Sequence, residues 1–331
     1  MGQPLRSSAR FPELQLSAGH YESFYLEASH PTDPVSIWIR YTVHKRPGQP
    51  PLGSLWFTLF DSREDGPWAV KATTPEVGAG ADHYIHVDGA RFEPGRVIGS
   101  AAAESREASW DLTFESPEPP FRHLPRDFMY STPLPRTKPL SPYPDARFSG
   151  RVEAGGRVVD LDGWRGMVGH NWGTQHAERW IWMHGAGFEG HDDAWFDATL
   201  GRIKVGPWTT PWVANGVLSL GGVRHRLGGL GATRRTEVFE RPDGAIFTLP
   251  GRGITVQGQI GADRKDFVGW VYADPDGSEH NTANCSISNL VLTVSRPAEP
   301  PLTLQIASGA AYELGMREKD HGIAIQPFPD G

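Results

Sequence analysis

Glycine and proline punctuate this chain from end to end and limit it to short structural elements. The 331 residues include 39 glycines and 29 prolines, about a fifth of the total, and they are spread throughout the sequence. Glycine weakens helix interiors and proline breaks them. Short hydrophobic segments separated by such turns every ~8–12 residues are typical of β-sandwiches and β-barrels. The sequence therefore predicts an all-β fold.

The segment 35–45 shows the alternation expected of a β-strand. Successive side chains of a strand point to opposite faces, so alternate residues lie on the same face. One face of this segment is apolar or aromatic, and the other mixes one tryptophan with polar side chains. Asp-Gly pairs at 243–244 and 276–277 are typical of hairpin turns. The chain lacks GxGxxG, P-loop, HExxH, GxSxG and CxxC motifs, which argues against the corresponding nucleotide-binding, metalloprotease, hydrolase and redox classes.

The composition argues against several kinds of partner. The chain has 32 Lys and Arg against 39 Asp and Glu, a net charge of −7, so no basic face is available for nucleic acid or for an anionic membrane. The longest apolar patch, 52–60, is too short for stable membrane insertion. Cys285 is the single cysteine, and residues 1–12 lack the apolar run of a secretory signal. These features predict a soluble cytoplasmic protein.

Proline is concentrated in one segment, which contains nine prolines between residues 117 and 144. Because proline disrupts strand ladders, we predict that 117–144 is a long irregular segment, either a loop that covers a surface or a linker. A division near residue 175 leaves two parts of similar size. We therefore predict an N-terminal domain, 1–175, which includes this segment as a loop, and a C-terminal domain, 176–331.

The most unusual stretch, 163–200, lies at the middle of the chain. Segments 178–189 and 194–205 flank a polar turn and predict a β-hairpin. The stretch contains five of the twelve tryptophans and four of the thirteen histidines, namely Trp164, Trp172, Trp180, Trp182, Trp195, His170, His176, His184 and His191.

Strand alternation sorts the polar and aromatic side chains of this stretch onto shared faces. The predicted groups are His170 with Trp172, Trp180 with Trp182 and His184, and Trp195 with Asp197. A carboxylic acid in an aromatic pocket has a raised pKa and can donate a proton. Indole faces can stabilise a cation formed nearby. This combination would suit protonation of an alkene or rearrangement of an electron-rich apolar substrate.

A packed core is the alternative interpretation of the same pattern. In that case the tryptophans would fill the interior, and Asp197 would bind backbone donors or pair with Arg165 or Arg179. A zinc site made from the four histidines is disfavoured because no two of them have HxH or HxxxH spacing. We predict no metal and no cofactor.

Three short motifs resemble the tandem lipocalin-like (calycin) family, which includes carotenoid 1,2-hydratases, tocopherol cyclase and lipocalin-like Diels–Alderases. They are Gly-His-Asn-Trp-Gly at 169–173, Trp-Ile-Trp at 180–182 and Trp-Phe-Asp at 195–197. The resemblance implies two successive β-barrels with a ligand cavity at or near their junction. In the hydratases, the His-x-Trp and aromatic-x-Asp pairs line the active site and the Asp donates a proton. That implies these roles for His170, Trp172, Trp195 and Asp197, with Trp195 in place of the expected tyrosine.

Residues and resemblance together predict a hydratase or cyclase, that is, a lyase or isomerase, acting on an apolar isoprenoid-like small molecule. Asp197 and His170 would be catalytic. The substrate-binding residues would be Trp172, Trp180, Trp182, His184 and Trp195. Two alternatives stay open: a Diels–Alderase-type pericyclase, and a non-catalytic lipid- or pigment-binding protein.

Overall fold

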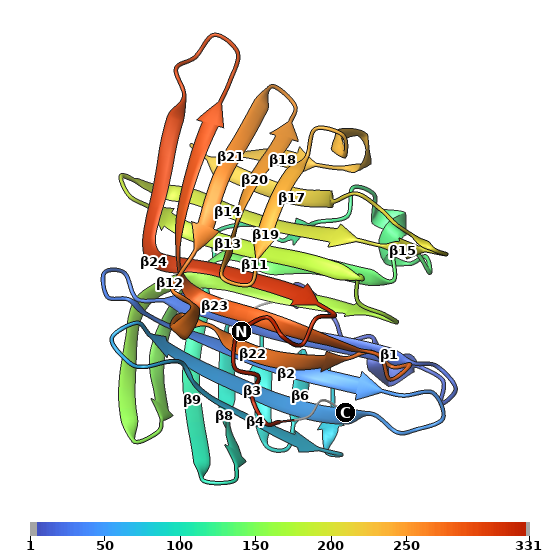
Figure 1. The fold of residues 1–331 in the computed structure, drawn as a ribbon. Coiled ribbons are helices and arrows are strands. Elements are labelled where there is room, and N and C mark those ends of the chain that lie inside the picture. Colours follow the sequence, from blue (N-terminus) through green and yellow to red (C-terminus); the bar gives the residue numbers. More distant parts are fainter. Residues whose placement is uncertain (1–4, 329–331) are drawn as a thin grey trace.

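The computed structural model describes residues 5–328, so the first four residues of the N-terminal segment and the last three of the chain lie outside it. Nearly all regular elements in this range are β-strands in two large antiparallel sheets, one below the other in Figure 1. Four short 3₁₀ helices are present: η1 (Phe11–Glu13), η2 (Asp127–Tyr130), η3 (Leu230–Ala232) and η4 (Arg264–Asp266). Within the described range, no helix has the length and apolar character needed to cross a membrane.

The first sheet contains the strands of the first half of the chain, in the order β4-β3-β2-β1-β12-β11-β9-β8-β7-β6-β5, with β10 beside β11. It curves until β4 contacts β8 and β9, which nearly closes a barrel. The strands are β1 (His20–Ser29), β2 (Val35–Lys45), β3 (Leu52–Asp61), β4 (Trp68–Thr74), β5 (Val77–Gly78), β6 (Ile85–Val87), β7 (Ala90–Glu93), β8 (Arg96–Ala103), β9 (Arg106–Glu115), β10 (Phe121–Arg122), β11 (Thr137–Ala154) and β12 (Arg157–Gly173).

The second sheet has the order β18-β17-β14-β13-β24-β23-β21-β20-β19, with β22 beside β23. A pairing of β18 with β20 closes it. Its strands are β13 (Arg179–Phe188), β14 (His191–Arg202), β17 (Val213–Leu220), β18 (Val223–Gly228), β19 (Glu237–Arg241), β20 (Gly244–Gly251), β21 (Ile254–Gly261), β22 (Val268–Ala273), β23 (Glu279–Ser295) and β24 (Leu302–Met316). A separate ribbon joins β15 (Lys204–Val205) to β16 (Trp208–Thr209).

Two barrel-like antiparallel sheets confirm the predicted fold class. The alternation along β2 separates the two faces as expected. Tyr41 points into the first barrel, where its ring lies 6.1 Å from that of Trp110 and 5.5 Å from that of Phe92. Phe24, on β1, also contacts Phe92. The interior of the first barrel is therefore packed with aromatic side chains.

The hairpin predicted in the central stretch is confirmed by the pairing of β13 with β14, in which His184 lies opposite Asp197. The prediction for 117–144 is wrong for its last eight residues, because β11 begins at Thr137 and runs through three prolines. Register shifts at Leu140/Tyr143 and at Tyr143/Ala146 interrupt the ladder there. Proline has no backbone N–H group to donate to the ladder. Because a bulge interrupts the ladder, the strand can continue through the prolines.

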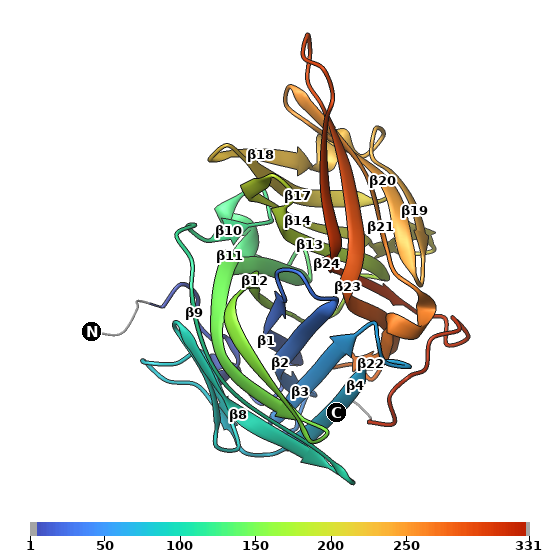
Figure 2. The ribbon, with the colours of Figure 1, turned by 90° about the vertical axis from the view of Figure 1, so that its left-hand side faces the viewer.

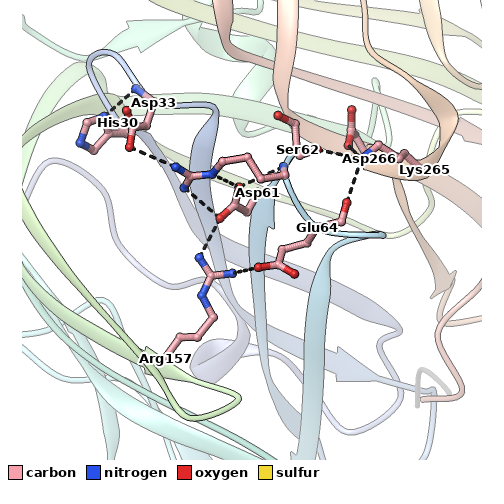
Figure 3. A network of polar contacts seen from close by, with 9 residues as sticks. His30, Asp33, Asp61, Ser62, Glu64, Arg157, Lys265 and Asp266 are labelled. Atoms are coloured by element: carbon pink, nitrogen blue, oxygen red, sulfur yellow. Dashed lines mark hydrogen bonds and ion pairs between the residues drawn. The ribbon is translucent and has the colours of Figure 1, made fainter.

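The two sheets pack directly against one another. β22 and β23 lie beside β1, β2 and β3 (Figures 1 and 2). Figure 3 shows a polar network that joins them: the Lys265 ammonium group, on η4, donates to the carbonyls of Ser62 and Glu64 at 2.7 and 2.8 Å. Arg157, on β12, binds the carboxylates of Asp61 and Glu64 at 2.7 and 3.1 Å. These contacts fix the turn after β3 to both sheets.

Candidate functional site

A cavity of about 1100 Å³ is lined by residues of both sheets. This is the size of a small-molecule site in proteins. The first sheet contributes side chains from the outer face of its barrel, and residues of the proline-rich segment, such as Leu124, Met129 and Leu134, form another part of the wall. The lining residues that the argument below uses are Tyr25, Trp182, Thr199, Asn215 and Glu313.

The strand register of the second sheet explains which of its side chains reach the cavity. Trp182 on β13 lies opposite Glu313 on β24 and Thr199 on β14, and Thr199 lies opposite Asn215 on β17. Directly opposed residues of paired strands have their side chains on the same face. These four residues therefore form one row across the cavity wall.

Asp197 lies two residues from that row on β14 and is fully buried behind the cavity lining. The Ser141 hydroxyl donates to its Oδ2 atom at 2.6 Å, and Nε2 of His123 lies 3.3 Å from the same oxygen. Its other oxygen, Oδ1, makes no hydrogen bond. Arg165 and Arg179, the alternative partners considered above, bind other carboxylates.

The predicted direction of the Asp197 pKa shift is wrong. Burial by itself would raise the pKa of this carboxyl group, but the charges of His123 and His184 and the hydrogen bonds from His123 and Ser141 outweigh burial. The pKa is therefore held below its usual range, and Asp197 is a carboxylate. It is suited to holding a charged imidazole rather than to donating a proton itself.

His123 connects Asp197 to the cavity wall. Its Nδ1 atom lies 3.1 Å from the carbonyl oxygen of Asn215 and 3.3 Å from the hydroxyl of Thr199, both of which line the cavity. Its Nε2 atom faces Asp197. Each ring nitrogen thus has an acceptor, which is the arrangement that a doubly protonated imidazole needs. Thr199, His123 and Asp197 form a polar path from the cavity into the protein.

A second buried acid–histidine pair joins the two sheets. Glu27, on β1, lies 2.6 Å from Nδ1 of His184, on β13, and the Pro144 carbonyl lies 2.9 Å from its Nε2. Burial opposes a charge on His184, but the hydrogen bond and charge of Glu27, together with the charge of Asp197, raise its pKa. Burial raises the pKa of Glu27, and His184 only partly offsets this effect. The pair therefore retains its shared proton.

The structure separates the predicted site residues. Trp180 and Trp182 line the cavity, whereas His184 lies behind the lining. Trp195 is buried away from it, in a cluster with Phe121 and Val217.

His170 and Trp172 belong to the first barrel, so the expectation that they share a pocket with Asp197 is wrong. The His170 ring stacks between Phe24 and Trp172, with centroids at 3.9 and 4.5 Å. Burial lowers its pKa. Along β12, the side chain of Asn171 lines the cavity, and His170 on the opposite face does not. Adjacent residues of a strand point to opposite faces, and both faces of β12 are largely buried here. The sequence pattern therefore could not show whether His170 or Asn171 faces the cavity.

His170 contacts the carboxylate of Glu22. This fully buried carboxylate accepts the backbone N–H groups of Arg10 and Phe11 at 2.9 Å and lies 2.8 Å from Nε2 of His170. Burial opposes ionisation of Glu22, but His170 and His20 outweigh it and lower its pKa to about 2. These contacts attach the N-terminal segment to β1 and β12.

Glu22→Gln is therefore expected to lower the free energy of unfolding at pH 7 by about 3 kcal/mol, from the shift between 4.5 and about 2. Because the folded-state pKa is lowered, this stability is present above pH 4.5 and is lost as the pH falls through about 2. Urea unfolding between pH 3 and pH 7 measures it. Exposed Glu13→Gln is the control. Equal unfolding midpoints for wild type and Glu22→Gln would contradict the assignment.

Several central residues were not predicted. His123 and Ser141 lie in the proline-rich segment, for which no site residue was predicted, and Glu27 lies on β1. Glu313 accepts hydrogen bonds from Trp180 Nε1 at 2.9 Å and from the Tyr272 hydroxyl at 2.8 Å. An acid between two apolar or aromatic neighbours in a strand is the signal that could have identified Glu27 and Glu313.

The two barrel-like sheets give this chain a tandem lipocalin-like fold, and the predicted resemblance is confirmed at the level of the fold. Three solved structures share it. A putative AttH from Nitrosomonas europaea has a TM-score of 0.57 and 14% identity over 94% of this chain and 97% of its own. Kievitone hydratase from Nectria haematococca (TM-score 0.54) and CghA with Sch210972 (TM-score 0.57) are each 10% identical, over 90% of this chain and 88% of theirs.

Sequence comparison adds two relatives. No family model matches the chain. Two uncharacterized proteins of Mycobacterium tuberculosis, from strains CDC 1551 and H37Rv, are each 26% identical over 179 residues, which is 54% of this chain. The chain spans about half the length (52%) of these curated relatives.

Proposed function

We propose that this chain is an enzyme that binds an apolar, isoprenoid-like small molecule in the cavity and protonates one of its double bonds. The polar path formed by Thr199, His123 and Asp197 at an aromatic cavity wall is the observation that carries this proposal. The fold shared with kievitone hydratase supports it.

In the proposed reaction, His123 carries the proton and Asp197 holds the charged ring in place. The Thr199 hydroxyl, 3.3 Å from His123, passes the proton to the substrate. The indole rings of Trp180 and Trp182 stabilise the resulting cation. Water then adds to the cation and returns a proton to the path of Thr199 and His123, which completes a hydratase reaction. A substrate hydroxyl that adds and loses its proton in the same way completes a cyclase reaction. His170 has a positioning role through Glu22 rather than a place at the substrate.

A pericyclase is the second candidate, and the fold shared with the Diels–Alderase CghA favours it. Such an enzyme would use the shape of the cavity and would not need the proton on His123. Loss of activity on removal of the Asp197 charge therefore distinguishes the two reactions. A protein that only binds its ligand would show no turnover in either case.

Filling the cavity tests the ligand-binding part of the proposal. Gly201 lines the cavity, and a Cβ atom there would lie 3.5 Å from the nearest side chain, an ordinary contact, so the backbone accepts a side chain that projects into the cavity. Gly201→Phe is expected to weaken binding of retinol, a fluorescent isoprenoid probe, by at least about tenfold, the loss of roughly 1.4 kcal/mol. Fluorescence titration measures the affinity.

Gly89→Phe is the matched control, because Gly89 lies in an exposed turn where an added Cβ atom meets nothing within 4 Å. It should bind retinol as the wild type does. Equal affinities for all three proteins would show that the probe binds elsewhere and would contradict the assignment of the cavity.

A further inference from the structure

A cluster of two histidines and one aspartate lies at the edge of the cavity and takes no part in the reaction proposed above. His176 belongs to the connection between β12 and β13, Asp274 follows β22, and His280 lies on β23. One potential ligand atom of each residue lies within 4.8 Å of the others. His176 also lines the cavity, so the cluster is close to the space in which a ligand would bind.

The polar atoms of this cluster are incompletely paired. Oδ1 of the fully buried Asp274 accepts the backbone N–H of His176 and lies 2.7 Å from Nδ1 of the same residue. Nδ1 of His280 lies 3.7 Å from Oδ2 of Asp274. His280 is fully buried, and neither of its ring nitrogens makes a hydrogen bond of normal geometry; nor does Nε2 of His176. Burying a polar atom without a hydrogen-bond partner costs free energy, so the convergence of several such atoms needs an explanation.

A metal ion is one explanation. The three residues bring potential ligand atoms within 4.8 Å of one another, and three of their ring nitrogens make no hydrogen bond. Imidazole nitrogens and a carboxylate oxygen are typical ligands of transition-metal ions in proteins.

Aromatic rings hold the two imidazoles in place. The His176 ring stacks on Tyr21, at a centroid distance of 3.9 Å, and on Trp180, at 5.1 Å. The ring of His280 meets that of Trp180 edge-on at 4.9 Å. Both potential ligands are therefore positioned before any ion binds, which reduces the entropy lost on binding.

We propose that His176, Asp274 and His280 bind a divalent transition-metal ion, and that Zn²⁺ is the best match to two imidazole nitrogens and one carboxylate oxygen. Ligand atoms of a tetrahedral zinc site lie about 3.3 Å apart, given bonds of about 2.0 Å. Here Nδ1 of His176 lies 2.7 Å from Oδ1 of Asp274, and Nδ1 of His280 lies 3.7 Å from Oδ2. The potential ligand atoms lie within 4.8 Å of one another, so side-chain rotation would have to bring them to this spacing. A bound ion would fix the connection between the barrels to the second sheet.

Metal titration of the whole chain tests this site. After treatment with EDTA, the wild type should bind one Zn²⁺ ion per chain by calorimetry, and Co²⁺ should give visible absorption bands. Asp274→Asn and His280→Gln should each weaken Zn²⁺ binding by about 100-fold or more, since even outer-shell changes cost about 10–100-fold. His191→Gln, outside the cluster, should bind as the wild type does. Zn²⁺ should raise the melting temperature of the wild type but not of His280→Gln.

Two results would overturn the proposal. One is a wild type that binds no stoichiometric Zn²⁺ and gives no Co²⁺ absorption, a test that does not depend on the folding of any variant. The other is unchanged affinity in folded Asp274→Asn and His280→Gln. Retinol binding by the metal-free wild type is measured alongside, so failure of the metal site stays separate from failure of the proposed ligand cavity.

Discussion

Replacing Asp197 with asparagine is expected to lower turnover by about 10²- to 10⁴-fold, the usual contribution of general acid–base catalysis. Asparagine keeps the shape of the side chain and can still accept the Ser141 hydroxyl, which lies 2.6 Å from Oδ2. It removes the negative charge that would hold a proton on His123. His123→Gln should have a similar effect. Mass spectrometry of an organic extract of the purified protein is used to search for a bound substrate, and product formation from that compound measures the turnover.

Binding of retinol should be unchanged in Asp197→Asn, because Asp197 lies behind the cavity lining. Asp193→Asn, an exposed change on the same strand, is the matched control and should keep full activity. Full turnover by Asp197→Asn would rule out the proton path and would support shape-based pericyclic catalysis instead.

Replacing Glu27 with glutamine is expected to produce the largest loss of stability, about 3–5 kcal/mol, because it leaves His184 buried without its carboxylate partner. The urea unfolding midpoint measures this loss. Asp160→Asn breaks an exposed ion pair with Arg151 and should cost no more than about 1 kcal/mol. Equal midpoints for Glu27→Gln and Asp160→Asn would show that the buried pair does not hold the sheets together.

The pH dependence of this loss has a defined sign. Glu27 contributes to raising the folded-state pKa of His184 above the ordinary histidine value of 6.5, and stability from such a shift is present below that value. It is lost as the pH rises through the folded-state pKa. The difference between wild type and Glu27→Gln should therefore be largest below pH 6.5 and should shrink at alkaline pH. A constant difference across this range would argue against a shared proton.

Local patterns predicted the fold class and the central hairpin, because strand alternation and turn residues act over a few neighbours. The strand at 137–144 was missed because its prolines are tolerated only at β-bulges, and the residue pattern does not show where these bulges occur. The cavity-lining tryptophans Trp180 and Trp182 were found from the hairpin pattern. Asp197 was named as a candidate, but its partners were not predicted: Ser141 is 56 positions away in the sequence. Contacts at such separations depend on how the barrels pack.

Side chains on the outer face of the first barrel line the cavity, and they do not pack in the interior of that barrel. Trp38 and Arg40 line the cavity, whereas Ile39 and Tyr41, between and beside them on β2, are buried on the other face. Mutations at the two outward positions can therefore reshape the ligand space without repacking the barrel that carries them. In an evolving lineage, selectivity could diverge on the first barrel while Asp197 on the second stays the same.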